Sequence, residues 1–192
     1  MKINQNPKVF GIGFHKTGTT SLAMALSILG YKNNRGLDTL RHKWGLDYCV
    51  KLLDEKNYYP YLEYIKNFDS TLDNPWYLLY RELDLNFPDS KFILTVRDDS
   101  KWLESCKFFF KGKKNPIHKH IYGKVEIKGN EEVYLDTYQK HNLAVRKYFA
   151  NRKEDFIELN WEKGDDWKML CNFLKKPVLN IPFPHINKKS EI

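Results

Sequence analysis

The stretch Lys8–Leu22, KVFGIGFHKTGTTSL, decides the fold. It opens with a short apolar run, Lys8–Ile12, that is typical of a buried strand, and the glycine-containing stretch Gly13–Gly18 follows at once. From Thr19 onward, apolar residues recur at helical spacing until Gly30, which is a natural stop after a helix. Strand, tight loop and helix therefore follow one another directly, in the order that a phosphate-binding loop requires.

The loop has the spacing of an anion site, but its lysine is displaced. Gly13 and Gly18 have the G-x4-G frame of the nucleotide-binding loop, whose lysine comes directly after the second glycine. Thr19 stands at that place here, and the lysine lies inside the loop, at Lys16. Main-chain amides of such a loop, together with the helix N-terminus, form a concave site for a phosphate or sulfate group. A glycine turn that merely precedes a helix is the alternative interpretation.

A second buried strand ends in an arginine. Lys91–Val96 is the clearest strand pattern of the chain, and Arg97 follows it directly. A Mg-dependent nucleotide hydrolase needs a carboxylate near such a strand end, so an arginine there favours a phosphate-carrying ligand over a metal. A surface ion pair of Arg97 with Asp98 or Glu104 is the alternative. The next helix is expected from about Lys101 to Phe110.

The rest of the chain alternates strand and helix patterns. Short strands are expected over residues 68–72 and 156–159, and Asp73-Asn74-Pro75 is expected to form a turn with proline at the start of a helix. The further helices are expected as two over residues 37–66, separated near Asn57–Pro60, and then over residues 76–86, 131–151 and 167–174.

This alternation predicts a single α/β domain over residues 1–192, built as three layers with a mainly parallel central sheet flanked by helices. Residues 111–130, rich in Lys, His and Gly, are expected to form a substrate or lid loop, because they show little periodicity. Residues 176–192 are expected to form a C-terminal tail.

Composition and charge limit the function classes. Hydrophobic residues make up 42% of the chain and aromatic residues 15%, which excludes a natively disordered protein. The 32 Lys and Arg residues exceed the 24 Asp and Glu residues, and the formal net charge of +8 favours an anionic ligand. Cys49, Cys106 and Cys171 are widely spaced, which argues against a disulfide scaffold or a zinc site. With no leader pattern and no apolar run near the roughly 20 residues of a membrane span, we expect a cytoplasmic protein.

The two motifs, in this order, resemble those of the PAPS-dependent sulfotransferase family, where PAPS is 3′-phosphoadenosine-5′-phosphosulfate. Phe14–Leu22 looks like the family's 5′-phosphosulfate-binding loop, and the loop GFHKTGTTSL is similar to that of the soluble branch. Arg97-Asp98-x3-Trp102-x2-Ser105 looks like its 3′-phosphate-binding element. The resemblance covers most of the chain and implies a P-loop fold. It also implies transfer of a sulfuryl group from PAPS to a hydroxyl or amine acceptor, with PAP as product and without a metal.

The candidate site residues follow from the motifs and the resemblance. Lys16 is the expected catalytic cation, because positive groups must meet the charge that develops on the transferred group. Asp73 is the first candidate for the general base and His15 the second, although Asp73 also fits an ordinary turn. The donor-binding residues that the resemblance implies are Lys16, Thr17, Gly18, Thr19, Thr20, Ser21, Arg97 and Ser105.

Other charged residues have no expected role in donor binding. Glu162-Lys163-Gly164 also resembles the end of this sulfotransferase branch, but the family's arginine before that lysine is Glu162 here. The other histidines are expected at the surface, with His118 and His120 placed to contact an acidic acceptor. These surface histidines are His42, His118, His120, His141 and His185.

Two alternative function classes stay open. A Mg-dependent, kinase-like P-loop enzyme would have to use Asp98 and Asp99 in place of the missing strand-end carboxylate. A noncatalytic PAPS- or nucleotide-binding module would suit the basic charge, although no nucleic-acid-binding motif supports a nucleic-acid partner. The expected partner of the enzyme is a small-molecule or carbohydrate acceptor, with no nucleic acid and no membrane span.

Overall fold

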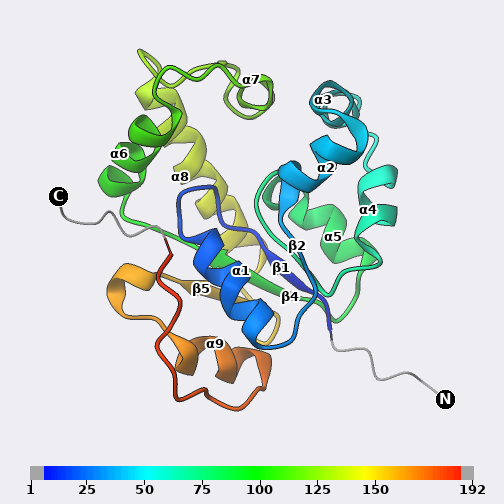
Figure 1. The fold of residues 1–192 in the computed structure, drawn as a ribbon, viewed down its shortest axis with the longest axis vertical. Helices are drawn as coiled ribbons and strands as arrows, with labels where there is room; N and C mark the ends of the chain where they lie inside the picture. Colours follow the sequence, from blue (N-terminus) through cyan, green and yellow to red (C-terminus); the bar gives the residue numbers. More distant parts are fainter. Residues whose placement is uncertain (1–6, 187–192) are drawn as a thin grey trace.

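Parallel strands form the centre of the molecule (Figure 1), for which the computed structural model describes residues 7–186. Within these residues the sheet has five strands in the order β2-β3-β1-β4-β5. Each neighbouring pair is parallel, so the carboxyl ends of all strands meet at one edge. The strands are β1 (Val9–Gly11), β2 (Asn33–Asn34), β3 (Ser70–Thr71), β4 (Lys91–Thr95) and β5 (Phe156–Leu159).

Helices cover both faces of the sheet (Figure 1), and short 3-10 turns follow β3 and β5. The predicted α/β fold is therefore confirmed. The helices are α1 (Thr19–Ile28), α2 (Gly36–Trp44), α3 (Leu46–Asp54), α4 (Tyr59–Ile65), α5 (Tyr80–Asn86), α6 (Asp99–Phe110), α7 (Pro116–Tyr122), α8 (Glu131–Tyr148) and α9 (Trp167–Leu174), and the 3-10 turns are η1 (Trp76–Leu79) and η2 (Trp161–Lys163).

The strands bury alternate residues in two separate cores, because successive side chains of a strand point to opposite faces. Val9 and Ile93 pack with α1 and α9 in one core. Phe10 and Phe92 point the other way and pack with α3 to α8 in the larger core. The central strands β1 and β4 are therefore buried on both faces, which explains why they appear in the sequence as continuous apolar runs.

Residues 111–130 differ from the loop that their composition suggests, because they contain α7. The Asn115 side chain accepts a hydrogen bond from the amide of Ile117, Pro116 occupies the first turn, and Gly123 ends the helix in the left-handed conformation. Ile117 and Tyr122 are buried against the larger core. Lys119 and the two histidines of α7 conceal its short apolar face in the sequence.

Two other segments also differ from expectation. Residues 37–66 form three helices and not two, since Gly45, with φ of 82°, separates α2 from α3. The two-residue strand β2 at the sheet edge was not predicted. Of the expected C-terminal tail, residues 176–186 are described, and Phe183 packs on Trp161 in the smaller core. Residues 187–192 lie outside the described part of the chain.

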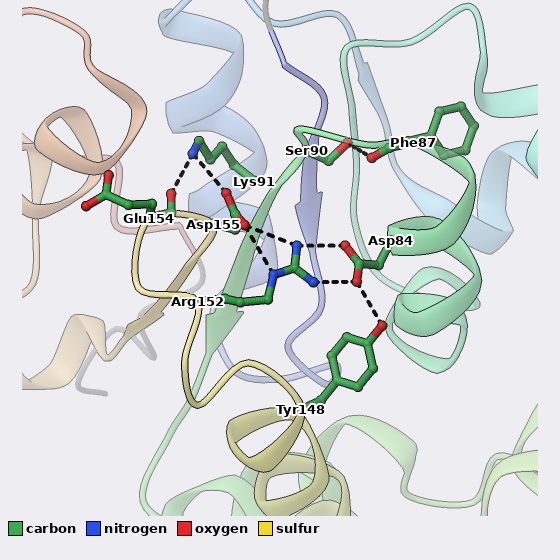
Figure 2. A network of polar contacts seen from close by, with 8 residues as sticks. All are labelled: Asp84, Phe87, Ser90, Lys91, Tyr148, Arg152, Glu154 and Asp155. Carbon is green, nitrogen blue, oxygen red and sulfur yellow. Dashed lines mark hydrogen bonds and ion pairs between the residues drawn. The ribbon is translucent and has the colours of Figure 1, made fainter.

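An ion-pair network holds the amino ends of β4 and β5, at the edge opposite the candidate site (Figure 2). Arg152 donates hydrogen bonds to both carboxylate oxygens of Asp84 on α5 and to Asp155. Tyr148 donates to Asp84 at 2.8 Å, and Lys91 Nζ lies 3.4 Å from Asp155 Oδ1. Although burial opposes it, hydrogen bonds from Arg152 and Tyr148 lower the pKa of Asp84. The network fixes the turn between α8 and β5 against α5.

Among residues 7–186, no helix is both long enough and apolar enough to cross a membrane.

Candidate active site

Four strand ends bring the predicted site residues to one edge of the sheet. The loop of residues 12–18 follows β1, Asp73 follows β3, Arg97 follows β4, and η2 follows β5. Because these strands are parallel and adjacent, the segments after them lie together beyond the carboxyl ends of the sheet.

The loop needs both of its glycines. A Cβ at Gly13 would lie 2.1 Å from the hydroxyl of Thr95 on β4, and a Cβ at Gly18 would lie 2.3 Å from Cδ1 of Trp161. Gly18 has φ of 91° and Lys16 has φ of 66°, so the chain passes twice through the left-handed region within this turn. The loop is thus pressed closely between Thr95 of β4 and Trp161 of η2.

The hydroxyls of Thr17 and Thr19 form hydrogen bonds within the protein. Thr17 donates to the carbonyl of Phe14 at 2.6 Å, and its oxygen lies 2.6 Å from the hydroxyl of Thr95, so this buried side chain braces the loop against β4. Thr19 donates to Asp73 Oδ1 at 2.7 Å. The second contact places the candidate base directly beside the loop.

The hydroxyls at the start of α1 contact two distant segments. Thr20 accepts a hydrogen bond from Arg35 Nη2 at 3.0 Å, and Ser21 accepts one from the amide of Ile186 at 3.1 Å. The last described residue of the chain therefore lies against the first turn of the helix that follows the loop.

Trp102 and Tyr138 join the two motifs physically. Trp102 Nε1 donates to the carbonyl of His15 at 2.9 Å, and its ring stacks on that of Tyr138 with centroids 4.2 Å apart. The Tyr138 hydroxyl accepts from the Arg97 amide at 3.0 Å and donates to the Arg97 carbonyl at 2.9 Å. The spacing between the loop and the strand-end arginine is therefore set by buried hydrogen bonds.

Lys16 projects toward α6. Its Nζ lies 3.9 Å from the centroid of the Phe109 ring, which is 48% exposed. Burial lowers the pKa of Lys16; among its charged neighbours Arg97 acts in the same direction and Asp73 opposes it. Arg97 and Asp73 thus each lie within electrostatic reach of Lys16.

Asp73 and His15 have different surroundings. Asp73 is half-buried, with φ of 67°, at the carboxyl end of β3. His15 is 8% exposed, and its Nδ1 and Nε2 lie 3.3 Å and 2.8 Å from the hydroxyls of Tyr77 and Tyr122. Burial lowers the pKa of His15 well below its usual value. The ring of His15 points into the aromatic core, with both nitrogens engaged.

The expectation of a surface position is wrong for His118, which is buried, whereas His141 is half-buried. His118 is 1% exposed and pairs with the hydroxyl of Tyr134 at 3.0 Å, and His141 Nε2 lies 2.8 Å from the Ile12 carbonyl. Burial lowers the pKa of each from 6.5 to about 4. The spacing of Tyr134, Tyr138 and His141 on one face of α8 was a sign of this burial. His120 is half-buried against Asp54, whereas His42 and His185 are exposed.

Arg97 has a partner that the sequence did not suggest. Its Nη2 lies 2.7 Å from Glu162 Oε1, and Lys101 Nζ lies 3.3 Å from Glu162 Oε2. The two partners expected from the sequence have other contacts: Asp98 accepts from amides at the start of α6, and Glu104 pairs with Lys107 at 2.9 Å.

Ser105 lies half-buried on α6, two turns after Arg97. The neighbouring Cys106 is buried, which raises the pKa of its thiol, and Lys16 and Arg97 both act against that shift. The middle of α6 therefore faces the same two cations that the motifs predicted for one ligand. Tyr138, Trp161, Glu162 and Lys101 were not predicted to contribute to the site.

Comparison with known proteins shows the family of the chain. A family model described as "Sulfotransferase domain" matches residues 8–116 and 114–192 of the chain. The Ava biosynthesis cluster protein M of Aspergillus versicolor is similar to the chain, with 26% identity over 217 residues that cover 93% of this chain and 80% of the relative.

Proposed function

Because the chain belongs to the sulfotransferase domain family, we propose that it transfers a sulfuryl group from PAPS to a hydroxyl or amine of a small-molecule or carbohydrate acceptor. The S–O bond of the phosphosulfate breaks, a bond forms between sulfur and the acceptor, and the acceptor proton passes to a base. PAP leaves with the former bridging oxygen. The name of the Aspergillus relative, a biosynthesis cluster protein, supports a small-molecule acceptor.

One observation carries the proposal. Two separate anion-binding elements, the loop after β1 and Arg97 after β4, are joined through Trp102, which donates to the carbonyl of His15 from the helix that Arg97 precedes. A donor with a 5′-phosphosulfate and a 3′-phosphate carries two anionic groups at a fixed spacing. A rigid pair of anion sites on adjacent strands suits such a ligand.

The loop and Lys16 would stabilise the transferring group. In this proposal the amides of residues 17–20 would hold an anion at the start of α1, and the Lys16 ammonium would add a positive charge where the sulfonate and bridging oxygens gain negative charge. Thr17 acts indirectly in this proposal, because its hydroxyl is committed to Phe14 and Thr95. Thr20 and Ser21 contribute their amides and hold the start of the helix.

Asp73 is the base in this proposal. It is half-buried beside the loop and takes a hydrogen bond from Thr19, which orients its carboxylate. The role of His15 is to position the loop, because both of its ring nitrogens lie within hydrogen-bond distance of tyrosine hydroxyls in the aromatic core. A carboxylate within hydrogen-bond reach of the acceptor contributes about 10²- to 10⁴-fold in rate.

The kinase-like alternative has less support. Asp98 accepts hydrogen bonds from two amides at the start of α6, and Asp99 accepts one from Gln139 Nε2. Each carboxylate that a metal would need after β4 is therefore engaged in holding α6. We also propose that the reaction occurs in the cytoplasm, since Cys49, Cys106 and Cys171 are all free thiols.

Thermal unfolding with PAP and with ADP, each with and without Mg²⁺, tests the donor. A ligand at about 100 times its Kd stabilises the folded state by roughly 2.7 kcal/mol. For a chain of this size we expect a shift of about 5 to 11 °C with PAP, independent of Mg²⁺. Equal stabilisation by ADP and Mg²⁺ would favour the kinase-like enzyme.

The variant Arg97→Ala adds a residue-level control to this test. A charge-assisted hydrogen bond to a phosphate contributes roughly 1.5 to 3 kcal/mol, so the variant is expected to bind PAP about tenfold to a hundredfold more weakly. Arg81→Ala, which removes an arginine on α5 away from the strand ends, is the matched control. Unchanged PAP affinity in Arg97→Ala would remove Arg97 from the donor site. Turnover of PAPS with a panel of hydroxyl and amine acceptors then separates an enzyme from a binding module.

A further inference from the structure

We infer that Glu162 is a specificity-determining residue that competes with the donor's 3′-phosphate for Arg97, and that Lys101 is a second cation for the same phosphate. The inference rests on the proposed function, because it takes PAPS as the donor. Neither Glu162 nor Lys101 is a phosphate ligand in the two sequence motifs.

The Glu162 carboxylate marks an anion position between two cations. One oxygen lies 2.7 Å from Arg97 Nη2 and the other lies 3.3 Å from Lys101 Nζ. Arg97 precedes α6, and Lys101 lies four residues later in the first turn of that helix. Glu162 lies on η2, which follows the neighbouring strand β5. A carboxylate bridging an arginine and a lysine uses the same charge-assisted contacts that a phosphate would use.

Arg97 is incompletely satisfied by this carboxylate. Its Nε is shielded from solvent and has no hydrogen-bond partner among residues 7–186. Guanidinium groups typically bind phosphates through two parallel N–H donors. A phosphate in place of the carboxylate would offer additional oxygens, so it can satisfy both Nε and Nη2. The orphaned donor is a second observation, independent of the ion pair, that points to an anionic ligand.

Glu162 is the partner that can move. Tyr138 holds both backbone polar groups of Arg97, which fixes the base of that side chain. The Glu162 side chain is 34% exposed and stands on a three-residue 3-10 turn. Exchange of the carboxylate for a phosphate therefore requires a side-chain rotation at Glu162 and no change in the sheet.

The charges of Arg97, Lys101 and Glu162 determine whether loss of the Glu162 carboxylate strengthens or weakens binding of a 3′-phosphate. Arg97 and Lys101 supply two positive charges and Glu162 removes one, so the carboxylate both occupies the cations and repels an incoming phosphate. A partly exposed ion pair of this kind is worth about fivefold in an equilibrium constant. Loss of the Glu162 charge should therefore tighten binding of a 3′-phosphate and leave the rest of the nucleotide site unaffected.

Calorimetric titration with PAP and with adenosine 5′-monophosphate tests the inference, because the two ligands differ by the 3′-phosphate alone. Glu162→Gln is expected to bind PAP about fivefold more tightly, and Lys101→Gln about fivefold more weakly, than the unmodified protein. Affinity for adenosine 5′-monophosphate should stay within about twofold in both variants. Glu63→Gln, which removes the same charge from an exposed pair with Lys66, is the matched control and should change neither affinity.

The outcomes separate this inference from the proposed function. If the unmodified protein binds PAP more tightly than the monophosphate but Glu162→Gln gains no affinity for PAP, Glu162 is a structural ion-pair partner and the inference is wrong. A Glu162→Gln variant that only unfolds at lower temperature, with no gain in PAP affinity, also overturns it. If the unmodified protein does not distinguish PAP from the monophosphate, the 3′-phosphate is not recognised, and the proposed donor and the inference both fail.

Discussion

The neighbours of Asp73 in the structure support its proposed role as the general base. Its position before Asn-Pro fits a simple turn, but the structure adds a hydrogen bond from Thr19 and electrostatic contact with Lys16. Lys16 lies in the loop after β1 and Thr19 begins α1, more than 50 positions from Asp73 in the sequence. The carboxylate is therefore oriented by the same residues that would hold the donor.

Replacing Asp73 by asparagine should separate catalysis from binding. Asparagine keeps an oxygen that can accept from Thr19 but cannot take a proton, so kcat is expected to fall about 10²- to 10⁴-fold while PAP affinity changes little. Steady-state rates with PAPS, together with PAP titration, measure the two effects. Asp136→Asn, on the exposed side of α8 where Asp136 pairs with Lys140, should behave like the unmodified protein. An unaltered kcat in Asp73→Asn would move the base to another group.

The sequence was least informative about which residues contact one another in the site. The place of Lys16, Asp73 and Arg97 at strand ends could be predicted, because local patterns define the strands. Their partners could not, because Glu162 lies far along the chain from Arg97, after a strand that pairs with β4. The inward orientation of His15 was equally hidden, since it depends on tyrosines from η1 and α7.

At the scale of elements, α6 connects the two halves of the site. Trp102 lies within its first turns, donates to the buried His15 carbonyl and stacks on Tyr138 of α8. The loop after β1 therefore depends on a helix that follows β4. A change in this contact should affect both stability and donor affinity.

The variant Trp102→Phe keeps an aromatic ring for stacking but removes the indole N–H. A buried carbonyl left without its donor typically destabilises a protein by about 1 to 3 kcal/mol. We expect this loss in urea unfolding, together with weaker PAP binding, because the loop is no longer held at a fixed distance from Arg97. Trp44→Phe, at a half-buried ring packed on Tyr61 and Tyr64, provides the comparison. Loss of stability without loss of PAP affinity would show that the contact does not position the loop.

Elements with strong local patterns were predicted well. The strands β1 and β4 are short apolar runs, and α1 and α9 begin and end at recognisable residues. The helix α7 was missed because four of its seven residues are polar or proline, and two of its buried positions are His118 and Tyr122. The residues that bury a helix face need not be aliphatic when the core itself is aromatic and contains histidine.

For the whole molecule, the larger core contains histidines that stay neutral. Burial lowers the pKa of His15, and it lowers the pKa of His118 and His141 from 6.5 to about 4. In the unfolded chain these rings titrate near pH 6.5, so the unfolded state binds more protons below that pH. The stability they contribute is complete above about pH 6.5 and decreases as the pH falls toward 4, at about 1.4 kcal/mol per pH unit for each ring.

Urea unfolding at pH 7.5, 6.0 and 5.0 measures this dependence. The free energy of unfolding should change little from pH 7.5 to about 6.5 and then decrease toward pH 5.0, a range in which carboxylates with ordinary pKa values are still largely ionised. His118→Gln should reduce the slope of stability against pH, whereas His42→Gln, at an exposed position, should not. A stability that is constant from pH 7.5 to 5.0 would mean that the buried rings accept protons without penalty.

The contact between Ser21 and the Ile186 amide determines where other proteins can be attached to this chain. It brings the carboxyl end of the described chain against the helix that begins at the anion loop. Pro7, in contrast, precedes β1 at the amino edge of the sheet, where the network of Arg152 and Asp84 lies (Figure 2). An affinity tag or fluorescent fusion joined after Ile186 would lie close to the first turn of α1, whereas one joined before Pro7 would lie at the opposite end of the sheet.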